Sequence, residues 1–216
     1  LAALSGEDRR AAAGSVRLFD KDIARAGPRQ RRAQGLHFVP EERLGRGAVP
    51  MSALSTNTLL TRSEPIKALG WIDTASAREL ATRLIERFKV KAAGPHAHAA
   101  SLSGGNLQKF IVGREIDAQP RVLIVAQPTW GVDVGAAAQI RAELLALRDA
   151  GCAVLVVSEE LDELFELADR LVVIARGRLS PSIATRDASV EQIGQWMAGL
   201  FEPMPPPSSQ VAHAAT

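Results

Sequence analysis

Three small residues, Ser103, Gly104 and Gly105, have the types and spacing that a phosphate-binding site needs. They lead directly into an amphipathic run that the sequence pattern predicts to be a helix. Glycines let a ligand approach the backbone closely, and unpaired N–H groups meet the positive end of the helix dipole at such a start. The serine also suits an ordinary helix cap after a loop. A bound phosphate and a plain cap are therefore both compatible with these residues.

The residues that follow connect this helix start with a known family. Residues 102–109 read LSGGNLQK and resemble the signature motif of ATP-binding cassette (ABC) ATPases, in the form seen in importers of simple sugars and nucleosides. The resemblance extends over nearly the whole chain, to about Leu200. It implies that Ser103, Gly104, Gly105 and Gln108 contact ATP in trans, at the nucleotide site of a partner cassette.

Other parts of the chain stand where the family has its Q-loop, Walker B motif, D-loop and H-loop. Residues 36–43, LHFVPEER, resemble the Q-loop of sugar-importer ATPases and put Glu41 at the glutamine position. Residues 122–125 form a short β-branched run that predicts a buried strand leading to the Walker B position. Asp133 falls at the D-loop. Residues 153–157 predict a second strand, which leads to the H-loop.

The catalytic positions differ from the family pattern. A Walker B strand normally ends in Asp and Glu, but Ala126 and Gln127 stand there, and Glu159 replaces the H-loop histidine. Glutamine cannot take a proton from water, which removes an effect of about 10²–10⁴ in rate. The sequence contains no G-x-x-x-x-G-K-[ST] loop, so we expect the Walker A motif to precede Leu1. No intact catalytic residue is predicted, and residues 1–216 alone should not hydrolyse ATP.

Composition narrows the remaining classes of function. The 216 residues are 46% hydrophobic and 23% charged, which is enough to bury a sizeable core. A net charge of +2 gives no ground for nucleic-acid binding, and no apolar segment reaches the roughly 18 residues of a membrane helix. Cys152 is predicted to be an inert core residue. His96 and His98 stand among glycine, proline and alanines, which favours a solvated loop over a metal site.

The order of patterns along the chain predicts an α/β fold. Alternating strands and helices favour a parallel sheet, and the resemblance implies a P-loop NTPase-like ABC cassette with a helical subdomain. The predicted strands are 15–20, 36–39, 122–125, 153–157 and 171–175, and the predicted helices are 76–88, 136–149, 161–168 and 188–200. The predicted parts are 1–50, the N-terminal part of the ATPase core with the Q-loop; 51–118, the helical subdomain with the signature motif; 119–201, the C-terminal part of the core; and 202–216, a disordered tail.

The resemblance implies an ATP-binding subunit of an ABC importer for simple sugars or nucleosides. The chain would be its C-terminal cassette, with a degenerate site of its own and a signature motif that acts in trans. ATP and Mg²⁺ would bind in the full transporter. A second cassette, transmembrane permease subunits and, indirectly, a solute-binding protein would be its partners, on the inner, cytoplasmic face of the membrane. The alternative is a non-catalytic cassette remnant that docks a permease or regulates a partner.

Overall fold

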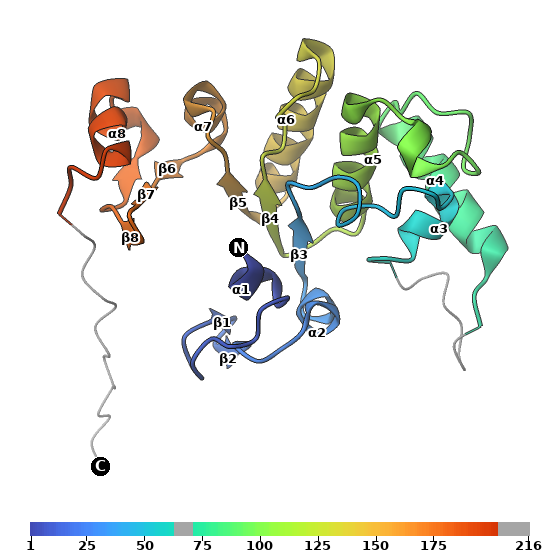
Figure 1. The fold of residues 1–216 in the computed structure, drawn as a ribbon, viewed down its shortest axis with the longest axis horizontal. Coiled ribbons are helices and arrows are strands. Elements are labelled where there is room, and N and C mark those ends of the chain that lie inside the picture. The colour runs from blue at the N-terminus through green and yellow to red at the C-terminus, as the bar shows by residue number, and fades with distance from the viewer. Residues whose placement is uncertain (63–70, 203–216) are drawn as a thin grey trace. The chain divides into compact units, whose positions relative to one another are not determined.

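A computed structural model of the chain describes residues 1–62 and 71–202. The chain divides into two compact units, residues 1–159 and residues 160–216. Figure 1 traces the helices and strands along the chain. The predicted disordered tail lies outside the described residues except for Glu202. No helix within the described ranges is long and apolar enough to cross a membrane.

A three-stranded parallel sheet lies at the centre of the first unit, in the order β3-β4-β5. Its strands are β3 (Leu36–Val39), β4 (Val122–Ala126) and β5 (Ala153–Val157). Leu36 pairs with Val122, which in turn pairs with Ala153, so the three strands start level. The middle strand is buried from Leu123 to Ala126, as its apolar, β-branched composition predicts. Each strand agrees with its predicted range to within one residue.

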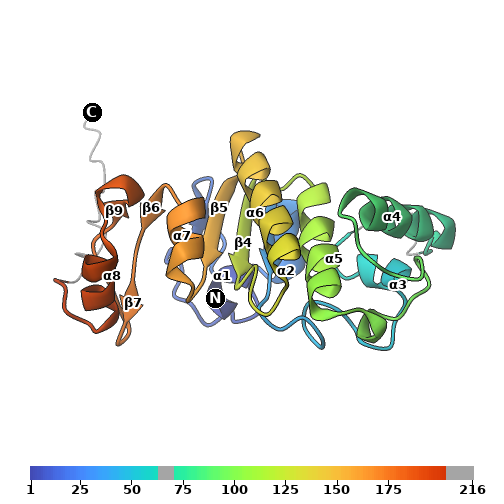
Figure 2. The ribbon, with the colours of Figure 1, turned by 90° about the horizontal axis from the view of Figure 1, so that it is seen from above.

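Two long helices, α5 (Gly104–Asp117) and α6 (Val134–Asp149), lie side by side next to this sheet, as Figures 1 and 2 show. α6 carries the chain from β4 to β5, which is the usual crossover between parallel strands. Gly113 of α5 leaves no room for a side chain, because a Cβ atom there would overlap the ring of Phe88. This glycine therefore lets the end of α4 (Thr74–Arg87) approach α5 closely.

The segment between β3 and α5 is helical, as predicted. It contains α3 (Leu54–Thr58), α4 (Thr74–Arg87) and the 3-10 turn η2 (Ala99–Ser101). Asp73 caps α4 by accepting hydrogen bonds from the backbone N–H groups of Ala75 and Ser76, so the helix begins two residues before its predicted start. The helix buries Leu80 and Leu84 on one face. Residues 63–70 lie outside the described residues.

The N-terminal segment corrects one prediction. Its elements are α1 (Ala2–Ser5), β1 (Arg17–Leu18), β2 (Lys21–Asp22) and α2 (Pro28–Ala33). A single strand over 15–20 is wrong, because Phe19 and Asp20 have φ values of 47° and 63° and reverse the chain. Two consecutive residues with positive φ suit a tight hairpin, and β1 and β2 pair antiparallel across them. The hairpin packs on the sheet through Leu18, Ile23, Leu36 and Ile124.

The second unit departs from the predicted parallel pattern. It contains α7 (Leu161–Leu167), β6 (Arg170–Leu171), β7 (Ile174–Ala175), β8 (Arg178–Leu179), β9 (Ile183–Ala184), η3 (Thr185–Asp187) and α8 (Val190–Met197). One strand over 171–175 is wrong: β6 pairs antiparallel with β9, and β7 with β8. Arg176 and Gly177 have φ values of 50° and 74°, which form the hairpin turn after β7.

Cys152 lies immediately before β5 rather than inside a strand. Its side chain is buried, and the thiol is free. Burial raises the pKa of this thiol above its ordinary value, which disfavours the reactive thiolate. The position agrees with the predicted inert core residue.

Candidate functional site

The start of α5 presents the predicted phosphate-binding residues. Ser103 occupies the N-cap position, and both Ser103 and Gly104 are exposed. The capping side chain predicted for Ser103 is wrong, because its Oγ makes no cap hydrogen bond and instead accepts one from the Asn106 side chain at 2.8 Å. The first N–H groups of a helix have no partner within the helix. The serine hydroxyl and these groups are thus presented together at an open helix start.

The two glycines that follow are required by close approaches. A Cβ atom at Gly104 would come within 2.8 Å of an Arg43 side-chain nitrogen. One at Gly105, which is buried, would come within 3.2 Å of the Asp133 carboxylate and 3.4 Å of Ala136. The start of α5 is therefore packed against the start of α6 and against the segment that follows β3. Glycines are the residues that permit both contacts.

Arg43 joins three segments that lie far apart in the sequence. Its Nε donates to the Gln108 side-chain oxygen at 3.1 Å, and its guanidinium also donates to the backbone carbonyl of Trp130. Gln108 is 1% exposed and donates in turn to the Pro128 carbonyl at 3.0 Å. Desolvation lowers the pKa of the Arg43 guanidinium. The segment after β3, the signature helix and the loop after β4 are thereby fixed to one another.

Arg43 is the residue of this site to which the sequence analysis assigned no role. The signal available for Arg43 was its place in the run Glu41-Glu42-Arg43. That signal shows a charge beside a motif but not its partner, because Arg43 and Gln108 are 65 positions apart. The burial of Gln108 was not predicted either, because nothing in LSGGNLQK distinguishes a buried glutamine from an exposed one.

Asp133 starts α6 close to the signature glycines. Its side chain accepts a hydrogen bond from the backbone N–H of Ala136 at 2.9 Å, and this bond lowers the pKa of the carboxyl group. The residue is exposed. Its carboxylate lies beside Gly105, as the close approach above shows. The structure thus brings the predicted D-loop residue next to the predicted signature residues.

The positions predicted for Walker B and the H-loop also meet. Ala126 is the last residue of β4 and is 1% exposed, and Gln127 follows it with a φ of 48°. The Gln127 side-chain oxygen lies 3.4 Å from both the Ser158 hydroxyl and the Glu159 backbone nitrogen, which donate to it. The end of β4 and the end of β5 are therefore joined through the glutamine amide. A carboxylate at either Walker B position is absent.

Glu41 lies apart from these contacts. It is exposed in the turn that follows β3 and the buried Pro40. Its neighbour Glu42 pairs with Arg46 at 2.7 Å, and Arg46 also pairs with Glu7. The structure places Glu41 on the same loop as Arg43, which is the residue that contacts the signature helix.

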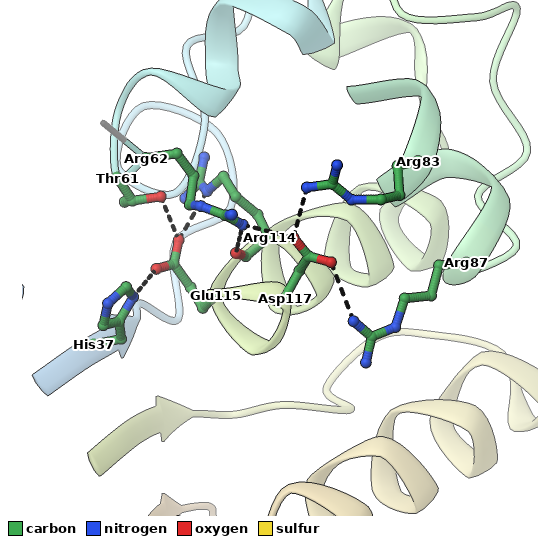
Figure 3. Close-up of polar contacts among 8 residues, drawn as sticks. All are labelled: His37, Thr61, Arg62, Arg83, Arg87, Arg114, Glu115 and Asp117. Atoms are coloured by element: carbon green, nitrogen blue, oxygen red, sulfur yellow. Dashed lines mark hydrogen bonds and ion pairs between the residues drawn. The ribbon is translucent and has the colours of Figure 1, made fainter. Parts of the chain in front are cut away.

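A buried network of charges fixes the other end of α5, as Figure 3 shows. Glu115 is fully buried and accepts from the Thr61 hydroxyl at 2.7 Å and from Arg114 Nε at 2.8 Å. His37 Nδ1 of β3 lies 2.8 Å from the other carboxylate oxygen. Arg114 also donates to the backbone carbonyls of Asn57 and Gly47. The network ties α5 to β3 and to the chain around α3.

Burial alone would raise the pKa of Glu115, but the Arg114 charge and the His37 hydrogen bond outweigh it and lower the pKa to about 2. A second cluster of charges surrounds Asp117, two residues further along α5. Asp117 pairs with Arg62 at 2.9 Å, Arg83 at 3.2 Å and Arg87 at 3.1 Å. Neither cluster was predicted from the sequence, because isolated charges in a helix usually indicate a solvated face.

No group of three or more His, Cys, Asp or Glu residues that could hold a metal ion occurs within residues 1–62 and 71–202. His96 and His98 are both exposed. With Ala126 and Gln127 at the end of β4, the side chains at this chain's own Walker B end do not fit Mg²⁺, which prefers carboxylate oxygens.

Comparison with known proteins identifies the family. No protein-family model matches the chain. The chain is 40% identical over 188 residues to the nucleoside import ATP-binding protein NupA of Lactococcus lactis, and 38% identical over 193 residues to the guanosine import ATP-binding protein NupO of Bacillus subtilis. These matches cover 86% and 88% of the chain but 37% and 38% of the relatives. The chain thus spans less than half the length of these relatives.

Solved structures share the fold. A nucleotide-free ATP-binding cassette from an ABC transporter matches 91% of the chain and 78% of its own length, with a TM-score of 0.66 and 22% identity. A dimeric ATP-binding cassette bound to ADP and Pi matches 78% of the chain and 72% of its own length, with a TM-score of 0.61 and 15% identity. These likenesses confirm the predicted fold class. Together with the import ATP-binding relatives, they show that the chain belongs to the ATP-binding cassette (ABC) ATPase family.

Proposed function

We propose that the chain is an ATP-binding cassette of an importer for simple sugars or nucleosides, and that its signature helix acts on the nucleotide of a partner cassette. The observation that carries the proposal is the open start of α5, where Ser103 and Gly104 are exposed while Gly105 and Gln108 are held in place. Exposed N–H groups at a helix start bind a phosphate well. The relatives NupA and NupO are nucleoside and guanosine import ATP-binding proteins, which supports ATP as the ligand and import as the process.

The site at the ends of β4 and β5 is proposed to be catalytically degenerate. Gln127 satisfies its side-chain oxygen with the Ser158 hydroxyl and the Glu159 backbone, and it has no group that takes a proton from water. Mg²⁺ would therefore be held by the partner cassette's side of the competent site. The contribution of this chain would be to position and stabilise the transferred phosphoryl group.

Ser103→Arg in the full importer tests this role. The bulky cation would fill the space at the open helix start, so ATPase activity of the assembled importer should fall by about 10²-fold or more, since misplacement of reacting groups costs that much. Ser15→Arg, at an exposed serine before β1, is the matched control and should leave the activity unchanged. Normal activity of Ser103→Arg would reject the trans role.

A second candidate function follows from the same degenerate positions. Ala126 and Gln127 are what a cassette remnant would carry if it only docked a permease or regulated a partner, without a part in ATP turnover. The two functions differ in the assay above: the remnant predicts that Ser103→Arg leaves ATP turnover intact while the importer still assembles.

The loop after β3 is the proposed contact with the transmembrane permease. Leu44 is 45% exposed, whereas Ala48 is 1% exposed, so Leu44 is the accessible position on this loop. Leu44→Cys should crosslink to a cytoplasmic segment of the permease in the assembled importer. Arg186→Cys, at an exposed residue of η3, is the control. Equal crosslinking at both positions would show that the loop does not contact the permease specifically. The proposed peripheral location of the chain at the membrane depends on the same contact.

A further inference from the structure

A basic cavity lies beyond the C-terminal end of α5, at the end of the sheet where β3 and β4 begin. Its volume is about 460 Å³, and it is lined by the β1–β2 hairpin, the end of α2 and the connection between α5 and β4. Figure 1 shows the hairpin and α2 beside the start of β3. A volume of this size is in the range of small-molecule sites, roughly 300–1,000 Å³.

Three cationic side chains line this cavity: Lys21, Arg32 and Arg121. The described residues that line it include no aspartate or glutamate. Lys21 and Arg32 make no ion pair with any residue that the structure describes. The Arg121 guanidinium lies over the ring of Phe19, 3.6 Å from its centroid, which holds it at the cavity wall. Three cations in a wall whose described lining contains no acidic side chain favour an anionic ligand.

Arg32 is the most enclosed of the three cations. It is partly buried at the end of α2, and desolvation lowers its pKa, while the buried Glu115 opposes this change. Glu115 already accepts hydrogen bonds from Thr61 and Arg114 and lies against His37. The Arg32 guanidinium therefore keeps its hydrogen-bond donors for another acceptor. A guanidinium can bind two oxygens of a phosphate at once.

Gln34 also lines the cavity, but its side-chain oxygen is shielded from solvent, so a ligand in the cavity does not reach it. The backbone of the wall is unusual at Gln119, which has a φ of 50° without being a glycine. The three cations are therefore the groups that would recognise a ligand in this cavity.

We propose that this cavity binds a small phosphate ester, with Lys21, Arg32 and Arg121 as partners of the phosphate. The site lies at the opposite end of α5 from Ser103 and does not depend on the proposed transport function. Its concave shape and small volume fit a compact ester, whereas a nucleic acid would need an extended basic surface.

Isothermal titration calorimetry of the 216-residue chain with ribose 5-phosphate tests the site. Binding should be measurable, with a Kd of about 1 mM or lower, and should weaken as salt is raised. Ribose, which lacks the phosphate, should not bind detectably. Absence of ribose 5-phosphate binding at about ten times that concentration, or equal binding of ribose, would overturn the proposal.

Variants locate the binding in the cavity. Arg32→Gln and Arg121→Gln should each weaken ribose 5-phosphate binding about tenfold or more, because each removes a charge-assisted hydrogen bond. Arg29→Gln is the matched control, since Arg29 is exposed on the same helix as Arg32 and does not line the cavity. Ser103→Arg should also leave the affinity unchanged. Equal weakening by Arg29→Gln or by Ser103→Arg would reject the site.

A conservative variant keeps the test decisive. Arg121→Lys keeps the charge and should bind more tightly than Arg121→Gln. Circular dichroism and thermal melts establish that each variant is folded. If Arg32→Gln does not fold, Lys21→Gln replaces it, and unchanged affinity in Lys21→Gln and Arg121→Gln together would overturn the proposal.

Discussion

The two ends of helix α5 are built in opposite ways. At its start, Ser103 and Gly104 are exposed. The Ser103 hydroxyl makes no cap hydrogen bond with the backbone and accepts one from the side chain of Asn106. At its end, Glu115 is fully buried and holds contacts from β3, from Thr61 and from Arg114. One end is available to a ligand, and the other is fixed to the sheet. A signature helix of this kind can present a rigid binding group because its far end cannot move independently.

The energetic difference between the ends should be large. A buried charge that loses its partners is costly, whereas an exposed hydroxyl that changes partners is not. Measurements that alter one end at a time can therefore confirm or reject the contrast. The two units of the chain make a two-state treatment unsafe for the whole protein, so unfolding is best followed by probes within residues 1–159.

Glu115→Gln should have the largest effect. It removes the charge that pairs with Arg114 and contacts His37, and a broken buried pair costs about 3–5 kcal/mol. The free energy of unfolding of the first unit, measured by urea titration, should fall by that amount. Glu79→Gln on the exposed side of α4 is the control and should change little. A loss below about 1 kcal/mol for Glu115→Gln would show that the buried end is not the anchor.

The same carboxylate should make stability fall in acid. The pKa of Glu115 is lowered from 4.5 to about 2 in the folded chain. A lowered folded pKa gives stability that is present above the unfolded pKa and is lost as the pH falls through the folded value. Urea midpoints of the first unit should therefore decrease between about pH 4.5 and pH 2. Glu115→Gln should show a smaller decrease over this window, and an equal decrease would exclude Glu115 as its source.

Arg43→Ala should affect activity more than stability. It removes the donors to Gln108 and to the Trp130 carbonyl, so the open end of α5 loses its support. ATPase activity of the assembled importer should fall by about 10-fold to 10²-fold, the scale expected for a misplaced binding group. Arg46→Ala removes surface ion pairs on the same loop and should leave activity nearly unchanged. Equal losses in both variants would assign the effect to the loop as a whole.

Ser103→Ala should have the smallest effect on stability. A capping serine usually contributes about 1 kcal/mol, but Ser103 makes no cap hydrogen bond. We expect a change below about 0.5 kcal/mol in the free energy of unfolding. Asp73→Ala, which removes a true cap at the start of α4, should cost about 1 kcal/mol. If both variants lost the same amount, the start of α5 would be stabilised by its serine after all.

Local patterns predicted the elements well where a local cause decides them. β3, β4 and β5 follow from short apolar runs, and α6 begins within two residues of its predicted start. The two errors, single strands over 15–20 and over 171–175, have different causes. Over 15–20, Phe19 and Asp20 both have positive φ and reverse the chain, and phenylalanine is not a residue from which such a turn is expected. Over 171–175, the apolar run is divided between β6 and β7, which pair with different strands, β9 and β8.

The sequence by itself determined the family, and it predicted a signature motif at residues 102–109 and non-acidic Walker B positions at Ala126 and Gln127, because each of these depends on residue identity along a short stretch. Only the tertiary structure decided how α5 is held. His37 and Glu115 are 78 positions apart, and Arg43 and Gln108 are 65 apart. Whether a charge is buried and paired depends on which strand or helix packs against it, and periodicity in one segment carries no record of that partner.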